Sequence, residues 1–243
     1  MDRTVHAEHQ EHLVHVTAAG VTLEGSLAIP EGAQGIVLFA HGSGSSRHSP
    51  RNRYVASVLQ QAGLATLLID LLTAEEEMVD MRTAHLRFDI NLLAERLMGA
   101  TDWLTEQPET RHLRIGYFGA STGAAAALVA AAERQGLVYA VVSRGGRPDL
   151  AGPELERVAA PTLLIVGGND VPVIGMNRGA LGYLQVEKRL TVVPGATHLF
   201  EEEGTLEEVA RLARDWFLNH LTTRPEWGQG TFRMDEMPGS GRR

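Results

Sequence analysis

Ser121 lies between two glycines in the segment YFGASTGAAAAL, which spans residues 117–128. An apolar run precedes GASTG and an alanine-rich run follows it, so the sequence predicts a strand, a tight turn and a helix. A serine on such a strained turn needs small neighbours, because larger side chains would collide with the strand and the helix. This context is typical of a catalytic nucleophile on a sharp turn. The simpler alternative is a small residue that fills the turn.

A serine hydroxyl is a weak nucleophile at neutral pH, so it needs a base to accept its proton and an acid to orient that base. Two downstream segments supply these residue types, each just after an apolar run: VGGND contains Asp170 and PGATHLF contains His198. The order Ser, Asp, His along the chain is that of α/β hydrolases. We therefore predict that Asp170 is the orienting acid and His198 the base.

Other residues could fill these roles. Asp149 is a second candidate acid, but it lies several residues beyond the end of the preceding strand. His41, His48 and His220 are alternatives to His198. His41 is expected to brace the loop after the third strand, and His220 ends the last predicted helix, where a cation suits the helix dipole.

An acyl transfer site also needs N–H donors for the oxyanion. One donor is expected from Thr122, which directly follows the nucleophile at the N-terminus of a helix. The other is expected from Ser43, in the loop AHGSGSSRHSPRN after the third predicted strand. This loop lacks the glycine and lysine pattern of phosphate-binding loops, so nucleotide binding is not expected.

Two arginines could reach the same cleft. Arg144 follows the sixth predicted strand, at the edge where sheets of this type bind ligands, and Arg47 lies on the oxyanion loop. They could hold an anionic substrate. Alternatively, Arg144 and Arg147 could pair with Asp149 and Glu154 as structural ions.

The elements that must position these residues follow from apolar periodicity. Strands are predicted at 12–18, 21–29, 35–40, 64–70, 113–118, 137–143, 161–167 and 189–194. Helices are predicted at about 51–62, 88–107, 122–135, 174–185 and 205–220. The first two strands should pair antiparallel. The later alternation of strands and helices predicts a mostly parallel eight-stranded sheet with helices on both faces.

The acidic stretch between the fourth strand and the next helix, at 71–88, is expected to be a solvated connection that could overhang a cleft. Residues 1–221 are expected to form one domain, and the Gly-, Pro- and charge-rich residues 222–243 a loosely held tail. Trp227 and Phe232 leave open a docking role for this tail. The sequence leaves the oligomeric state open.

Composition excludes several classes of function. The 243 residues carry a formal net charge of −8, with a pI near 5.7, which disfavours nucleic acid and anionic membranes as partners. There is no cysteine, hence no disulfide and no thiolate metal site. The histidines at 6, 9, 12 and 15 do not have the spacing of a converging metal site, so no metal or cofactor is expected. No secretory signal or membrane span is evident, and a cytoplasmic location is expected.

Six segments together resemble the dienelactone-hydrolase-like branch of the α/β hydrolases: HGSGSSRHSPRN, DLLTAEEE, FGASTGAAAAL, SRGGRPDL, LLIVGGND and VPGATHLF. The resemblance spans residues 12–221 and implies a triad of Ser121, Asp170 and His198. Dienelactone hydrolase itself uses a cysteine nucleophile, with a glutamate on the loop after the third strand, whereas this chain has Ser121 and HGSG. A serine esterase that makes an acyl-enzyme fits better than a lactone-specific enzyme. A lactone or thioester hydrolase, an acyltransferase and a slow ligand-binding module are the alternatives.

Overall fold

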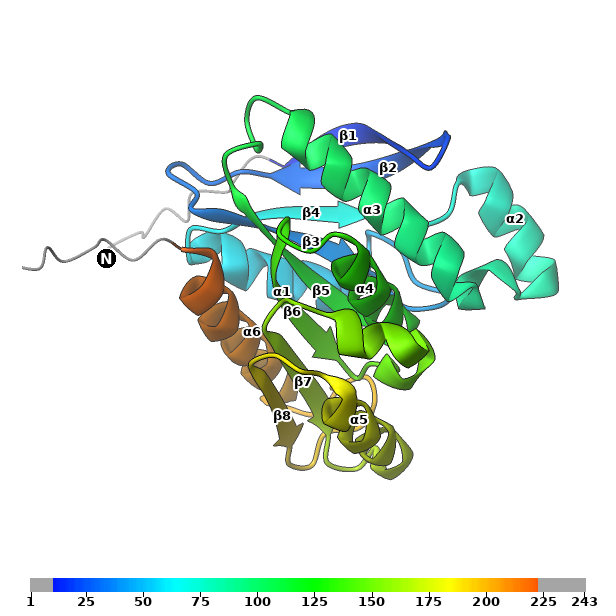
Figure 1. Ribbon diagram of the computed structural model, residues 1–243, viewed down its shortest axis with the longest axis vertical. Helices are drawn as coiled ribbons and strands as arrows, with labels where there is room; N and C mark the ends of the chain where they lie inside the picture. The colour runs from blue at the N-terminus through cyan, green and yellow to red at the C-terminus, as the bar shows by residue number, and fades with distance from the viewer. Residues whose placement is uncertain (1–10, 223–243) are drawn as a thin grey trace, which may run out of the picture.

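The computed structural model describes residues 11–222, which form an eight-stranded sheet with helices on both faces (Figure 1). The strands lie in the order β1-β2-β4-β3-β5-β6-β7-β8. Their bounds are β1 (Glu11–Ala18), β2 (Val21–Ala28), β3 (Gly35–Ala40), β4 (Ala65–Ile69), β5 (Arg114–Ala120), β6 (Val138–Arg144), β7 (Thr162–Gly167) and β8 (Lys188–Val193). β2 pairs antiparallel with both β1 and β4, and every other pair of neighbours is parallel. The predicted sheet is therefore confirmed.

The helices divide between the two faces of the sheet. They are α1 (Pro50–Gln61), α2 (Ala74–Thr83), α3 (Ile90–Glu106), α4 (Thr122–Glu133), α5 (Val171–Tyr183) and α6 (Thr205–Leu221), with short 3₁₀ segments η1 (Leu86–Phe88) and η2 (Pro148–Arg157). Figure 1 shows α1 and α6 on one face and α3, α4 and α5 on the other, with α2 at one end of the molecule. None of the helices within the described residues is long and apolar enough to cross a membrane.

Two hydrophobic cores result from the alternation of side chains along the central strands. All six residues of β3 are buried. Val37 and Phe39 pack toward α1 and α6, whereas Ile36 and Leu38 pack toward α3 and α4. A strand buried on both faces reads as a continuous apolar run, and for this reason the central strands are evident from the sequence.

The alanine-rich helix α4 lies deep in the molecule, with ten of its twelve residues buried. Its methyl side chains let the helix backbone approach β5 and β3 closely, as the sequence predicts. Because this helix begins directly after Ser121, close packing of α4 also fixes where the turn lies.

The segment between β4 and α3 differs from the sequence-based expectation. Residues 71–88 were expected to be a solvated connection, but they contain α2 and η1. α2 has a complete capping box, in which Thr73 and Glu76 exchange side-chain and backbone hydrogen bonds at 2.8 and 3.2 Å. Three glutamates in its first turn suit the positive end of the helix dipole. Only Asp80 of α2 is buried, so the helix lacks the apolar stripe by which helices are predicted.

Candidate active site

Ser121 occupies the turn between β5 and α4 with φ 51° and ψ −121°, a strained conformation for a residue other than glycine. Hydrogen bonds hold its backbone on both sides. Its N–H donates to the carbonyl of Arg144 at 3.2 Å, and its own carbonyl accepts from the N–H groups of Ala124 and Arg147, each at 3.1 Å. The turn therefore presents the serine at the carboxyl edge of the sheet.

The neighbouring chain leaves no space for larger residues near this turn. A Cβ atom added at Gly123 would lie 2.4 Å from the carbonyl oxygens of Ala40 and His41. A Cβ atom added at Gly42 would lie 3.0 Å from the Cβ of Ser121. The loop after β3 thus passes directly beside Ser121, where an oxyanion donor is required.

His198 and Asp170 are in contact at the same edge. Asp170 follows β7 as the N-cap of α5, and its Oδ2 lies 2.7 Å from Nδ1 of His198 on the loop after β8. A carboxylate on Nδ1 fixes the tautomer and leaves Nε2 to accept a proton. A Cβ added at Gly145, the residue after Arg144, would lie 3.5 Å from Nδ1 of His198. His198 and Ser121 therefore flank the end of β6.

The alternative acid and bases have other partners. Asp149 pairs with Arg147 at 2.8 Å. His41 is buried, where Nδ1 lies 2.9 Å from the carbonyl of Gly42 and Nε2 accepts from the Leu71 N–H at 3.1 Å. Burial lowers the pKa of His41, so its ring is neutral and braces the loop as expected.

The remaining two histidines lie apart from this pair. His220 stacks on Trp216 at the end of α6 and contacts its carbonyl at 2.8 Å. His48 is an exposed residue of the loop that leads into α1. Of the four histidines that were weighed as the base, only His198 contacts the candidate acid.

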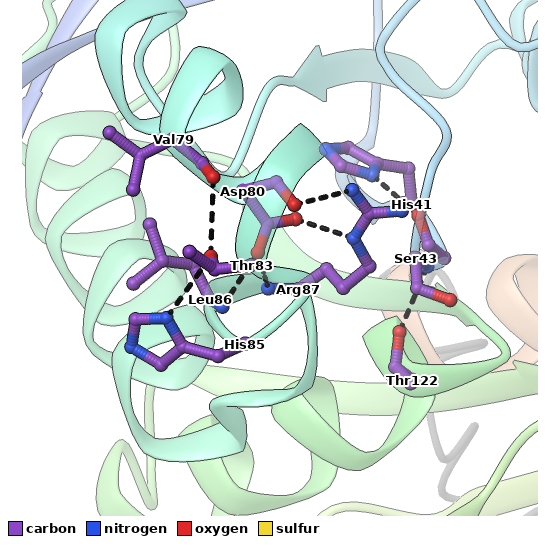
Figure 2. Close-up of polar contacts among 10 residues, drawn as sticks. His41, Ser43, Val79, Asp80, Thr83, His85, Leu86, Arg87 and Thr122 are labelled. Atoms are coloured by element: carbon purple, nitrogen blue, oxygen red, sulfur yellow. Dashed lines mark hydrogen bonds and ion pairs between the residues drawn. The ribbon is translucent and has the colours of Figure 1, made fainter.

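The two predicted oxyanion donors are linked to each other. The N–H of Ser43 donates to Oγ1 of Thr122 at 3.0 Å (Figure 2). Thr122 is the first residue of α4, where backbone N–H groups have no carbonyl partner within the helix. The loop after β3 and the start of α4 thus converge on the side of the turn where an oxyanion would form.

Arg47, which was predicted to contact substrate, is paired with carboxylates of the chain itself. Its guanidinium forms ion pairs with Asp70, after β4, and with Glu24 of β2, the latter at 2.5 Å. Its backbone N–H also donates to Asp70 at 2.6 Å. With two carboxylates on its guanidinium, Arg47 ties the loop to the sheet.

The two arginines after β6 differ from each other. Arg147 pairs with Asp149, which corresponds to the structural-ion alternative. Arg144 is buried, and its Nη2 lies 3.4 Å from Oδ1 of Asn52 on α1. Burial, together with the nearby charge of Arg51, lowers the pKa of Arg144 to about 10, so it still carries its charge at neutral pH.

A cavity of about 570 Å³ lies beside Ser43 and Thr122 and is lined by the loop after β3, α2 and η1. Apolar and polar side chains line it, among them Leu72, Met81, Leu93, His48, Glu77 and Arg87. Part of the cavity wall thus comes from α2 and η1, which lie in the segment that the sequence predicts to be a solvated connection. The three adjacent glutamates after Thr73 were the one available signal of a helix N-terminus.

Asp80 holds α2 and η1 together at this cavity. It is 2% exposed and accepts from the backbone N–H of Leu86 at 2.7 Å and from Nε of Arg87 at 2.5 Å. Burial acts to raise the pKa of Asp80, but these hydrogen bonds and the Arg87 charge outweigh it and lower the pKa. Asp80 is therefore an ionised anchor of the cavity wall.

The predictions about metals and the tail are only partly covered by the structure. Between residues 11 and 222, no cluster of three or more His, Asp or Glu side chains could hold a metal. His12 and His15 lie on β1, while His6, His9 and the predicted tail, with Trp227 and Phe232, lie outside the described residues.

The sheet order, the strained serine turn and the Asp–His pair define this protein as an α/β hydrolase. More specifically, the chain belongs to the dienelactone hydrolase family, whose family model matches residues 23–222. A solved structure named as a dienelactone hydrolase from Anabaena variabilis is 69% identical, with a TM-score of 0.86, and covers 87% of this chain and 98% of that one.

More distant solved structures share the fold alone. Est1E from Butyrivibrio proteoclasticus, solved with ferulic acid bound, is 16% identical with a TM-score of 0.71, over 85% of this chain and 98% of that one. Among curated proteins, one from Mycobacterium tuberculosis named "Putative phosphoribosyl transferase" is 62% identical over 208 residues, or 86% of this chain and 46% of that protein. The chain thus spans about half the length of this relative.

Proposed function

We propose that this chain is a serine hydrolase that cleaves carboxylic esters through an acyl-enzyme on Ser121. The observation that carries the proposal is the 2.7 Å contact between His198 and Asp170 at the sheet edge where the strained Ser121 turn lies. An imidazole oriented by a carboxylate, close to a serine on a strained turn, is the arrangement that activates a hydroxyl for acyl transfer.

The proposed reaction has two half-reactions. Oγ of Ser121 attacks the ester carbonyl while Nε2 of His198 takes its proton, and the N–H of Thr122 stabilises the oxyanion. The N–H of Ser43, which donates to Oγ1 of Thr122 in the free protein, exchanges this acceptor for the oxyanion. The protonated His198 then gives this proton to the departing alcohol. In the second half-reaction His198 deprotonates a water, which attacks the acyl carbonyl and releases the acid and Ser121. The proposed chemistry uses only these groups and water.

The cavity beside Ser43 and Thr122 supports a small ester as the substrate. A volume of about 570 Å³ with Leu72, Met81 and Leu93 in its wall can take a short apolar group next to the reacting carbonyl. Lactones, thioesters and transfer to an acceptor other than water would use the same groups, and pocket shape decides among them.

Phosphoribosyl transfer, the activity in the name of the M. tuberculosis relative, is not proposed for this chain. The matched region is the hydrolase fold, and it makes up only about half of that protein. Moreover, the loop after β3 lacks the pattern of a phosphate-binding loop, and its Arg47 is already paired with Glu24 and Asp70. We propose that transferase activity, where present, belongs to the other half of the relative.

A panel of p-nitrophenyl esters, combined with a fluorophosphonate label, tests the proposal. Wild type should turn over short-chain esters and bind the label covalently. Ser121→Ala should lose both, with turnover falling by about 10³-fold or more at an unchanged Tm, because triad members act as a unit. Ester turnover that survives Ser121→Ala would refute the proposal. Rapid labelling without turnover would instead favour a ligand-binding module.

A further inference from the structure

Arg144 carries a buried charge for which the described residues supply no counter-charge. Its side chain is 8% exposed, and no carboxylate among residues 11–222 lies within ion-pair distance. Its Nε and Nη1 are fully buried without a hydrogen-bond partner. The one contact, from Nη2 to Asn52 Oδ1, is long at 3.4 Å. Arg144 thus has more donors than the fold satisfies.

Arg96, the other buried arginine, shows which partners this fold supplies to a buried guanidinium. Arg96 is 3% exposed, and its Nη2 donates to Glu76 at 2.6 Å. Its Nη1 donates to the carbonyls of Ala18 and Ala19 at 3.1 and 3.2 Å. Its Nε alone lacks a partner, whereas Arg144 lacks one at both Nε and Nη1. Burying a cation without such partners is costly. A group outside the chain is therefore expected to complete the surroundings of Arg144.

The surroundings of Arg144 favour an anion. Its guanidinium points at the first turn of α1, where Asn52 lies and where a helix has the positive end of its dipole. Arg51 of the same turn is close enough to lower the pKa of Arg144, and its own Nε is also buried and unpartnered. Arg51 has a single carboxylate partner, Glu201, at 3.3 Å. Arg51 and Arg144 carry two positive charges and Glu201 carries one negative charge. The remaining positive charge suits one bound monoanion.

We propose that Arg144 and the first turn of α1 form a binding site for a small monoanionic group, a carboxylate or an inorganic anion of similar size. The site adjoins the candidate active site, since the carbonyl of Arg144 accepts the Ser121 N–H and the next residue lies against His198. The anion could be free in solution or could be a carboxylate carried by the ester. This second source rests on the proposed function, whereas the first does not.

Thermal unfolding tests the site without any turnover. Tm is measured in formate, nitrate and chloride, with the bulky anion gluconate keeping the ionic strength constant. Small anions should raise Tm in a saturable way, as expected for a ligand that binds the folded state. In Arg144→Met this response should vanish, whereas Arg147→Met, which removes the neighbouring paired arginine, should keep it.

Asn52→Asp provides a second test that does not depend on removing the arginine. The new carboxylate would lie where Oδ1 now contacts Arg144, so the chain would supply its own counter-charge. Its Tm without small anions should exceed that of wild type, and added formate should have little further effect. A wild-type anion response preserved in both Arg144→Met and Asn52→Asp would overturn the proposal.

The source of the anion is found from a matched pair of esters, p-nitrophenyl hemisuccinate and the neutral p-nitrophenyl valerate. If the substrate carries the anion, Arg144→Met should lose kcat/KM for the charged ester by about tenfold more than for the neutral one. Equal losses, together with the Tm response, would assign the site to a free anion. If Tm and ester preference are both independent of Arg144, the site does not exist. Absence of ester turnover with an intact Tm response would refute the proposed function alone.

Discussion

The hydroxyl of Thr122 joins two groups on which the proposed chemistry depends. It belongs to the residue after the nucleophile, it is 4% exposed, and it accepts the N–H of Ser43 at 3.0 Å. This bond links the loop after β3 directly to α4. Since both residues are proposed oxyanion donors, their separation depends on it.

Thr122→Val tests this connection with almost no change of shape. The valine leaves the Ser43 N–H without its acceptor, so the loop should lose its position and kcat/KM should fall by about tenfold, the value of one buried hydrogen bond. Thr122→Ser should restore most of the rate. Activity of the valine variant equal to or above wild type would instead mean that the hydroxyl only blocks the Ser43 donor.

The nucleophile, acid and base candidates could be predicted because their order along the chain is characteristic of the fold. Ser121, Asp170 and His198 follow strand ends in the chain order of α/β hydrolases, and the structure brings the acid and the histidine into contact. The partners of Arg47 were not predictable, because Glu24 and Asp70 meet it through the pairing of β2 with β4. For Arg144, the sequence left two alternatives open, and burial together with the absence of a carboxylate partner among the described residues decides against the structural ion.

At the scale of elements, α2 is the helix that is least attached to the body. Asp80 is its one buried residue, while Met78, Val79 and Met81 are more than half exposed. Two charged contacts hold it: Asp80 with Arg87, and Glu76 with Arg96. Its position over the cavity therefore depends on polar anchors more than on apolar burial.

Asp80→Asn should loosen this segment without affecting the core. The variant loses the ionised acceptor of Arg87, so KM for esters that fill the cavity should rise while kcat for p-nitrophenyl acetate stays near wild type. Limited proteolysis should cut within 74–88 sooner than in wild type. Because the pKa of Asp80 is lowered from 3.8 on folding, its stabilising effect holds above that value and is lost as the pH falls through the lower folded value. Wild type should then become protease-sensitive here in acid, and unchanged cleavage would contradict this role of Asp80.

The elements that the sequence predicts best are those buried on both sides. The strands β3 to β7 and the helix α4 are nearly continuous apolar runs, and their bounds agree with the prediction within about two residues. The start of α5 differs more from the prediction. It lies at Val171, directly after the N-cap Asp170, and not at residue 174. α2 and η2 were missed because few of their residues face the core.

At the scale of the molecule, the end of α6 packs against the start of the central strand β3. Leu221 is fully buried, and a Cβ added at Gly35 would lie 2.7 Å from its Cβ. Thr222 then caps the helix through Oγ1 and the carbonyl of Leu218 at 2.5 Å. Among the described residues, Leu221 is the last member of the core between the sheet, α1 and α6.

A chain that ends at Thr222 should therefore fold as the full chain does. Its Tm should stay within about 2 °C of wild type, which corresponds to less than about 1 kcal/mol for a protein of this size. A chain that ends at Leu218, which removes the buried Leu221, is the matched control and should melt clearly lower. If the first truncation lowers Tm as much as the second, residues beyond Thr222 contribute to the body.

The polar attachment of α2 also has a consequence for redesign of the enzyme. Residues 71–89 enter from β4 and leave into α3, and between these fixed ends the cavity wall rests on Asp80 and Glu76. Such a segment can be exchanged as a cassette. Grafting variants of it onto an unchanged β5–α4 turn would change which esters enter the cavity, without any new demand on the residues that break the bond. A library confined to this cassette should therefore yield altered selectivity more often than one spread over α4, where each added methylene meets packed backbone.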